Sequence, residues 1–265
     1  MLLNHLFVIA FGLITGSFLN VCIYRIPEGE SIIKPSSHCI KCGKKLKAAD
    51  LIPVFSYLLL RGKCRYCKVD ISPRYVLVEI VTAAVFLLLF IKYGLSMDFI
   101  AMAYLMAILI AVFFIDLRHK IIPNELVAAG LIGSVPVIAY NIFEPLKIYS
   151  DARWWAPLLG ILPGCGFLFM VASAGFLLYG SDDAMGMGDV KIFAPIGLFL
   201  GWKMCIIALL LSIITGGVSG IILVAAKVKG RRDTIPFGPF IVLGTLIAIM
   251  WGENILGWYL DSFKI

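Results

Sequence analysis

Two aspartates at the ends of apolar runs are the residues of this sequence best placed to do chemistry. Asp116 ends one run, and Asp189 follows the tripeptide Gly-Met-Gly after a short polar break. A carboxylate in or near lipid is costly unless it is paired, solvated or used. Two close carboxylates share a proton, so one can act as a base on water while the other protonates a scissile carbonyl. The pair could therefore hydrolyse a peptide bond, although helix capping or pairing with Arg118 and Lys191 remains an open alternative.

Four cysteines have the spacing of a metal site. Cys39 and Cys42 form one Cys-x2-Cys pair, Cys64 and Cys67 form another, and Gly43 favours a tight turn after the first. Each turn could give two thiolates to a tetrahedral zinc ion. The alternatives are two disulfides or four free thiols, but disulfides rarely persist in the cytoplasm, where so basic a loop belongs. We predict a structural zinc site, because four thiolates leave no open coordination position.

The composition indicates a membrane protein that must hold these residues between apolar helices. Of the 265 residues, 61% are hydrophobic and only 15% are charged, and the mean hydropathy is +1.00. Soluble domains of this length carry more charge. The net charge of +7 could suit nucleic acid, but the basic residues lie in loops beside apolar runs, where orientation in the membrane explains them better. The expected partner is therefore the lipid bilayer and not nucleic acid.

Apolar runs predict an all-α polytopic protein with about eight transmembrane helices, because a helix of about 20 residues crosses a bilayer. The shortest run has 12 residues and would rise only about 18 Å, short of a core of roughly 30 Å. A helix that begins at Asp189 would place this aspartate at the membrane surface. The runs cover residues 2–23, 75–91, 99–115, 124–142, 154–179, 190–201, 204–226 and 237–252.

The distribution of charge predicts three parts: a first transmembrane helix (1–23), a cytoplasmic basic zinc-binding domain (24–74) and a seven-helix transmembrane domain (75–265). The second part holds eleven Lys and Arg against four acids. If it is cytoplasmic, most of the 23 basic residues lie on the cytoplasmic side, as the positive-inside rule requires. This topology places both termini outside and both aspartates at the cytoplasmic face.

Several short stretches follow one another in a characteristic order. With these stretches, the chain resembles the bacterial type IV prepilin peptidases, also called prepilin leader peptidase/N-methyltransferases, over nearly its whole length. The order and spacing of the stretches together make the resemblance specific. They are residues 16–27, the two cysteine pairs, 51–57, 61–64, 72–79, 115–116 with 122–123, 186–191 and 235–239.

The resemblance implies an intramembrane aspartic peptidase of the type shared with presenilin-like enzymes, with Asp116 and Asp189 as the catalytic pair. It implies removal of a basic leader from prepilins or pseudopilins in the bacterial inner membrane, then methylation of the new N-terminus by S-adenosylmethionine. Gly62 matches a family position linked to methylation, although a turn glycine before the second cysteine pair is an equally good interpretation. Asp183 matches an acidic family position, and no motif for S-adenosylmethionine is recognisable.

Two other classes of function fit parts of the sequence. A transporter could use Asp116, Asp189 and Glu79 as a proton relay, since acids within the membrane also mark ion pathways. A membrane scaffold could recruit a cytoplasmic partner through the zinc loop. Transport predicts uptake coupled to a gradient and the scaffold predicts no chemistry, so a shortened prepilin product would distinguish the peptidase from both.

Overall fold

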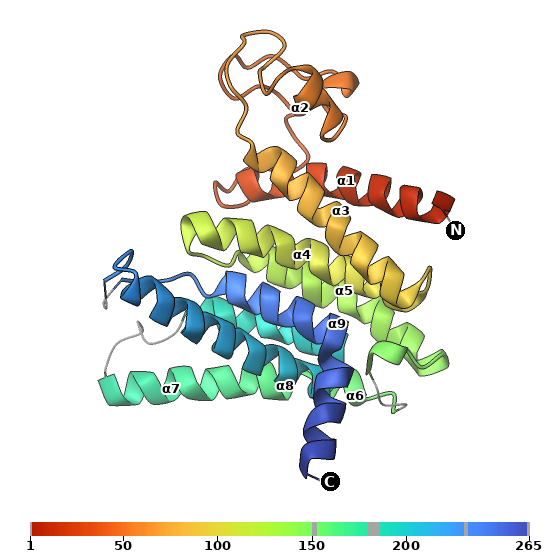
Figure 1. The fold of residues 1–265 in the computed structure, drawn as a ribbon, viewed down its shortest axis with the longest axis vertical. Coiled ribbons are helices and arrows are strands. Elements are labelled where there is room, and N and C mark those ends of the chain that lie inside the picture. The colour runs from red at the N-terminus through yellow and green to blue at the C-terminus, as the bar shows by residue number, and fades with distance from the viewer. Residues whose placement is uncertain (1, 150–152, 180–185, 231–232, 264–265) are drawn as a thin grey trace. The chain divides into compact units, whose positions relative to one another are not determined.

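The computed structural model describes residues 2–149, 153–179, 186–230 and 233–263, and within these ranges the regular elements are helices (Figure 1). The predicted all-α class is thereby confirmed. The chain forms two compact units, Met1–Phe99 and Ile100–Ile265. Asp183, for which the sequence suggested an acidic family position, lies outside the described residues.

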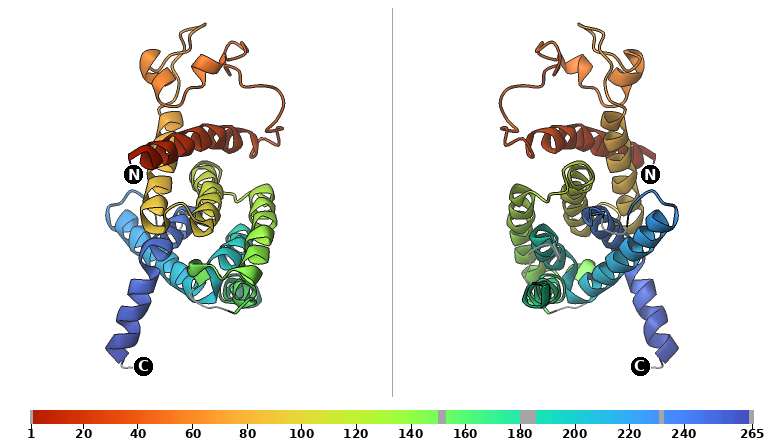
Figure 2. Two further views of the ribbon diagram at one scale, coloured as in Figure 1. Left: turned by 90° about the vertical axis from the view of Figure 1, so that its right-hand side faces the viewer. Right: turned by 90° about the vertical axis from the view of Figure 1, so that its left-hand side faces the viewer.

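The first unit is built on two long helices, α1 (Leu2–Arg25) and α3 (Arg74–Tyr93), which cross each other in both views of Figure 2. Two glycines of α1, four residues apart, allow the crossing. A Cβ atom on Gly12 would lie 2.6 Å from the Cα of Ala83, and one on Gly16 would lie 2.6 Å from the Cα of Glu79. Small residues at this spacing let helix backbones approach closely in a membrane, where packing drives association.

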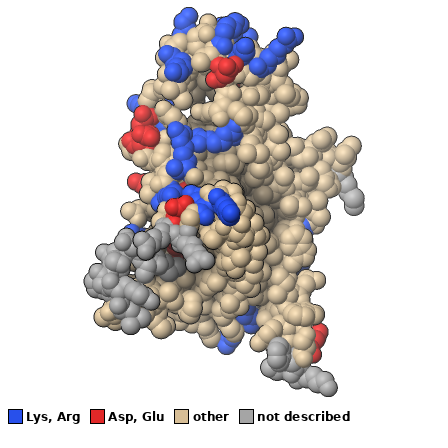
Figure 3. Space-filling model, turned by 60° about the vertical axis from the view of Figure 1, so that its left-hand side comes forward, with Lys and Arg blue, Asp and Glu red and all other residues tan. Residues whose placement is uncertain are grey.

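The cysteine loop, residues 26–73, connects these two helices. It contains the 3-10 helix η1 (Ala48–Asp50), the short helix α2 (Phe55–Leu59) and two isolated β-bridges. The bridges join His38 to Lys45 and Lys63 to Asp70. Basic side chains gather on the surface of this loop, at the top of Figure 3.

The second unit contains the other long helices. Helix α4 (Met97–His119) begins at the end of the first unit, and α5 (Asn124–Phe143), α7 (Phe167–Tyr179), α8 (Met187–Ala225) and α9 (Gly238–Phe263) follow. Three short elements lie between α5 and α7: η2 (Lys147–Tyr149), α6 (Ala156–Leu159) and the π-helical η3 (Leu162–Gly166).

The core of this unit is apolar and tightly packed around α4 and the first half of α8. The rings of Tyr104 and Phe199 stack with their centroids 6.0 Å apart. A Cβ atom on Gly130 in α5 would lie 2.7 Å from the Cβ of Pro195 in α8. The side chains of Leu109 and Ile115 are fully buried. Helix α4 is therefore an interior helix, and the packing around it fixes the position of its last turn.

Seven helical stretches of the described chain are long and apolar enough to cross a membrane. One of them, α8, has 39 residues and consists of two helices that meet at a kink at Gly201, where φ is +70°. At 1.5 Å per residue, the part before the kink rises about 21 Å and the part after it about 36 Å. Two of the eight predicted apolar runs fall on α8, 190–201 and all but the last residue of 204–226, which accounts for the difference between seven and eight.

Candidate active site and metal centre

Asp116 lies in the last turn of α4 and is buried, with 5% of its surface exposed. Helix α4 stops soon afterwards, because Lys120 takes up a φ of +54° and Pro123 follows. The Oδ2 atom of Asp116 accepts a hydrogen bond of 2.8 Å from the backbone amide of Gly238, the first residue of α9. The carboxylate is thus held between the end of one helix and the start of another.

Gly238 leaves no room for a side chain beside this carboxylate. A Cβ atom on Gly238 would lie 2.7 Å from Oδ2 of Asp116 and 3.0 Å from its Cβ and Cγ atoms. Contacts under 3.0 Å force atoms to shift. Gly238 was not assigned a role from sequence, and the available signal was its place in the stretch 235–239 that carried the resemblance.

A second contact joins the loop after α4 to the segment before α9. The Nζ atom of Lys120 donates to the hydroxyl of Thr234 at 2.8 Å and lies 3.3 Å from its carbonyl oxygen. The positive charge of Lys120 also acts on Asp116. This lysine therefore fixes the position of the chain that delivers Gly238.

Asp189 is the third residue of α8 and is partly buried. Its amide donates to the carbonyl of Gly186 at 3.0 Å, which closes the first turn of the helix. Gly188 lies against the segment that follows α4, since a Cβ atom there would be 3.0 Å from the Cβ of Ile122. Lys191 donates to the side chain of Asn124 at 3.1 Å. These contacts hold the start of α8 against the segment that joins α4 to α5.

The two aspartates lie close enough for the charge of Asp116 to act on Asp189. They come from two helix ends that are far apart in the sequence, and both belong to the second unit. Two carboxylates whose charges interact favour a state in which one of them is protonated. This arrangement can supply one base and one acid to the same bond.

The four predicted cysteines come together in the cysteine loop. Their Sγ atoms all lie within 4.8 Å of one another, and those of Cys39 and Cys67 are 3.8 Å apart. All four are free thiols, whereas a disulfide would need about 2.05 Å. Tetrahedral zinc with Zn–S bonds of about 2.3 Å separates its sulfur ligands by roughly 3.8 Å. The donor set and its size fit a metal ion, as predicted from the spacing.

The two cysteine pairs have the same backbone structure. In each, the amide of the first cysteine donates to the carbonyl five residues later, and the amide four residues later donates back to the first cysteine. The turn needs a positive φ at the residue four positions after the first cysteine. This residue is Gly43 in the first pair (+68°) and Lys68 in the second (+60°). Glycine takes up this conformation freely and lysine does so at a cost.

Backbone amides prepare one of the sulfurs for a metal. The amides of Cys67 and Tyr66 donate to the thiol of Cys64 and lower its pKa from the ordinary 9.0 to about 7. Because the thiolate is the form that binds metal, this turn favours the ligating state near neutral pH.

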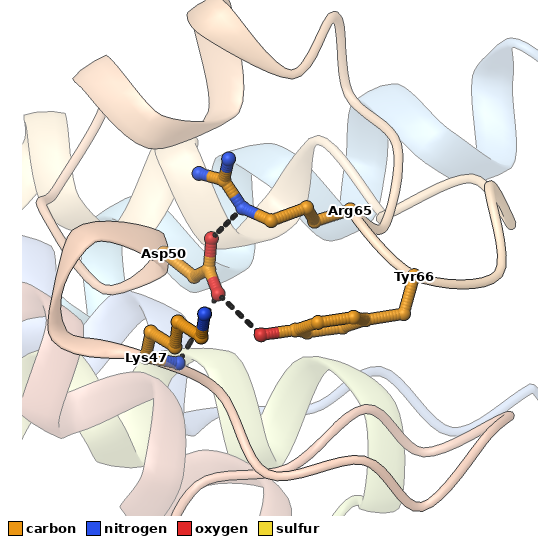
Figure 4. A network of polar contacts seen from close by, with 4 residues as sticks. All are labelled: Lys47, Asp50, Arg65 and Tyr66. Atoms are coloured by element: carbon orange, nitrogen blue, oxygen red, sulfur yellow. Dashed lines mark hydrogen bonds and ion pairs between the residues drawn. The ribbon is translucent and has the colours of Figure 1, made fainter.

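Asp50 braces the second cysteine pair, as Figure 4 shows. Its carboxylate forms an ion pair with Arg65, whose Nε donates to it at 2.6 Å, and accepts a 3.4 Å hydrogen bond from the hydroxyl of Tyr66. Both partners lie between the two cysteines of that pair. The amide of Lys47 donates to the same carboxylate at 3.1 Å, and Arg65 holds the pKa of Asp50 below its usual value. Sequence reasoning missed Asp50, which no spacing connects to the cysteines.

Gly62 lies in the turn that leads into the second cysteine pair. Its φ is +70°, and a Cβ atom there would lie 3.0 Å from the hydroxyl oxygen of Tyr57. Its amide donates to the carbonyl of Tyr57 at 2.9 Å. The conformation and the close neighbour both explain a glycine at this position without any part in methyl transfer.

The models of two protein families match the chain. The Bacterial Peptidase A24 N-terminal domain matches residues 10–93, and the Type IV leader peptidase family matches residues 103–221. No solved structure matches the chain.

Three relatives carry the name prepilin leader peptidase/N-methyltransferase. The protein of Bacillus subtilis (strain 168) is 36% identical over 260 residues, 98% of each chain. That of Legionella pneumophila is 34% identical over 97% of this chain and 94% of the relative. That of Aeromonas hydrophila is 33% identical over 97% and 93%. Because the likeness covers nearly the whole of each protein, the chain belongs to the type IV leader peptidase family.

Proposed function

We propose that this protein is a membrane aspartic peptidase that cleaves the basic leader from type IV prepilins or pseudopilins, and that it then methylates the new N-terminal residue. Relatives of nearly equal length bear the name of both activities. The observation that supports the peptidase most directly is the buried carboxylate of Asp116 beside the charge of Asp189.

In the proposed reaction, the pair of Asp116 and Asp189 holds one proton. The ionised carboxylate takes a proton from water as the water oxygen attacks the scissile carbonyl carbon. The protonated partner donates to the carbonyl oxygen, so negative charge does not accumulate there. The aspartate that took the water proton then gives it to the leaving nitrogen as the C–N bond breaks, and one hydroxyl of the diol gives its proton to the other aspartate, which leaves a carboxyl group and the new N-terminal amine. Gly238 positions Asp116 for this sequence of steps.

The proposed methyl donor is S-adenosylmethionine, which supplies an electrophilic methyl group to the uncharged amine. Gly62 is our proposed position for methyl transfer, on the resemblance alone. Its turn geometry, described above, accounts for the glycine by a structural role, so a substitution that affects methylation must be checked against damage to the loop.

The other functional assignments extend this proposal. Zinc, held by Cys39, Cys42, Cys64 and Cys67, would be a structural ion because four thiolates fill its coordination shell. The protein would lie in the bacterial cytoplasmic membrane with both termini outside, and with the cysteine loop and both aspartates at the cytoplasmic face. The division into a first helix (1–23), a zinc-binding domain (24–74) and a peptidase domain (75–265) belongs to the same proposal.

Cleavage of a membrane-presented prepilin by the purified protein tests this function. A prepilin carries a basic leader followed by an apolar helix, and an aspartate pair at the membrane surface can meet the junction without unwinding the helix deep in lipid. We expect the full-length substrate in detergent or lipid to be shortened at the leader, with much slower turnover of a soluble peptide that spans only the junction. An intact prepilin would contradict the proposal, and gradient-coupled solute uptake in the same preparation would favour transport.

A further inference from the structure

A cluster of apolar side chains is exposed in the otherwise basic cysteine loop. Phe55 and Leu59 expose 61% and 83% of their surface. Phe55, Leu58 and Leu59 recur at positions i, i+3 and i+4 on the short helix α2, and the exposed Leu51 and Ile52 lie in the turn that precedes it. Clustered exposed apolar residues mark a binding surface. The apolar face consists of Leu51, Ile52, Phe55, Leu58 and Leu59.

A buried carboxylate fixes this face beside a membrane span. The amide of Val54 donates to Oε2 of Glu79 at 2.8 Å. Glu79 is buried on α3, six residues into the helix counting from Arg74, which is about 7–8 Å along its axis. An acid within a span needs a partner, and the loop amide supplies one. The backbone around Val54 is therefore held level with the second turn of α3, near the depth at which that span enters the bilayer.

Helix α2, which carries part of the apolar face, borders a hollow that it shares with the outer surface of α3. An open hollow runs from Tyr57 on α2 to Val76, Leu77 and Ile80 in the first turns of α3. Leu77 and Ile80 are about half exposed on a helix with the length and composition of a membrane span. Lipid that covers these two side chains would also reach the hollow and Tyr57 on α2.

Positive charge follows the apolar face at once. Arg61 and Lys63 come directly after it, and the cysteine loop as a whole is strongly basic (Figure 3). Long basic side chains lay their apolar stems on the membrane surface and extend their charges to the headgroups. Basic residues next to an apolar helix face are the combination that binds anionic lipid.

We propose that residues 51–60 form an interfacial segment, which lies in the membrane surface beside α3 and binds anionic phospholipid. The segment connects the two cysteine pairs, so its insertion would hold the metal centre at the membrane surface rather than free in the cytoplasm. A surface for a second copy of the chain or for another protein would be a different account, and the experiment below separates them.

Photo-crosslinking to lipid tests the proposal. The photoreactive amino acid p-benzoylphenylalanine would replace Leu59 in one variant and Ile40 in a control. Ile40 is also apolar and exposed (59%), but it lies inside the first cysteine pair. The full-length protein would be placed in nanodiscs that contain phosphatidylglycerol and phosphatidylcholine and then irradiated. Intact mass spectrometry would measure the mass of the protein with any crosslinked lipid.

We expect the Leu59 variant to gain the mass of one phospholipid, with phosphatidylglycerol favoured over its share in the bilayer, and the Ile40 variant to gain little. Absence of a lipid adduct at position 59, or equal adducts at both positions, would overturn the proposal. So would a crosslink at position 59 to a second protein chain in place of lipid.

Glu79→Leu tests the anchor separately, because it removes the acceptor of the Val54 amide. We expect lipid crosslinking at position 59 to fall several-fold while the bound metal, measured on the same sample, stays unchanged. Metal retention shows that the loop is still folded. Unchanged crosslinking in this variant would disprove the role of Glu79. Should the variant fail to insert or lose its metal, Glu79→Gln provides the second test, since its amide oxygen can still accept the bond and should preserve crosslinking.

Discussion

The metal centre and the aspartate pair are built in opposite ways. The four cysteines lie within 29 residues, in two turns with the same hydrogen bonds, and the second turn is braced by Asp50. The aspartate site joins three helix ends that are far apart in the sequence: the last turn of α4 and the first turns of α8 and α9. The metal centre is therefore a local structure, whereas the carboxylate pair depends on the packing of the whole second unit.

This difference determines which residues support each site. Around the cysteines, backbone amides and one carboxylate shape a turn that the chain could form by itself. Around Asp116, the support is a close approach of backbone, since Gly238 both donates its amide and leaves room by lacking a side chain. Substitutions near the metal should therefore act locally, and substitutions near the aspartates should act through small shifts between helices.

The largest effect is expected from the aspartates. Asp116→Asn and Asp189→Asn keep the side-chain volume and remove the carboxylate that activates water or donates the proton. Each should lower prepilin cleavage by at least about a thousandfold, because groups that act as a unit fail together. The matched control is Asp261→Asn, which alters an exposed residue in the last turns of α9. This variant should cleave the prepilin normally. Normal cleavage by the Asp116→Asn or the Asp189→Asn variant would exclude the substituted residue from the mechanism.

Loss of a single cysteine should empty the metal centre. Cys67→Ser replaces one thiolate by a weak oxygen ligand, and the remaining three sulfurs no longer complete the tetrahedron. We expect about one zinc per chain in the parent protein and almost none in the variant, by metal analysis of freshly purified, unchelated samples. Cys165→Ser, outside the cluster, should keep its metal. A parent protein without metal would refute the centre itself.

Gly238→Ala should impair cleavage without removing any functional group. The added methyl would lie 2.7 Å from Oδ2 of Asp116, and a displacement of about 1 Å in a catalytic group can cost roughly a hundredfold in rate. The loss should appear in kcat rather than KM. Gly217→Ala in α8 has open space around its new Cβ, so it should retain activity. Equal rates in the two variants would show that the close approach has no consequence.

Asp50→Asn should weaken the metal centre rather than abolish it. The change removes the charge that pairs with Arg65 and one of the acceptor oxygens, and outer partners of metal ligands contribute about tenfold to metal affinity. Competition with a chelator would measure the difference. Asp70→Asn in the same loop removes a carboxylate that is 87% exposed and makes only a long ion pair of 4.0 Å with Lys63. The metal affinity of this variant should therefore not change. Equal affinities would exclude the brace.

The smallest effect concerns the turn conformation. Lys68 occupies the positive-φ position that glycine occupies in the first turn. Lys68→Gly should therefore stabilise the loop by about 0.5–1 kcal/mol, and Gly43→Ala should destabilise it. The temperature at which the loop releases its metal reports both changes. A lower release temperature in Lys68→Gly would show that the lysine side chain contributes more than its backbone conformation costs.

The features that sequence could predict are those with a local period or spacing. Apolar runs indicated the helical class, and the non-helical backbone at Gly201 lies at the junction of two of them, 190–201 and 204–226. The Cys-x2-Cys spacing indicated the cysteine cluster. Sequence reasoning did not identify Gly238, the pair of Lys120 and Thr234, or Asp50. Each of them acts through a contact with a residue distant in the sequence, and no sequence pattern predicts such a contact. The two aspartates were singled out by their unusual positions, and their pairing came from the resemblance rather than from physics.

The central claim is that one carboxylate pair carries leader removal while methyl transfer proceeds elsewhere. Intact-mass measurement tests it most directly, on Asp116→Asn and Asp189→Asn given S-adenosylmethionine together with either a prepilin or a substrate already cleaved. We predict an unshortened prepilin in the first reaction and a gain of one methyl group, about 14 Da, in the second. A shortened prepilin in either variant, or loss of methylation in both, would contradict the account.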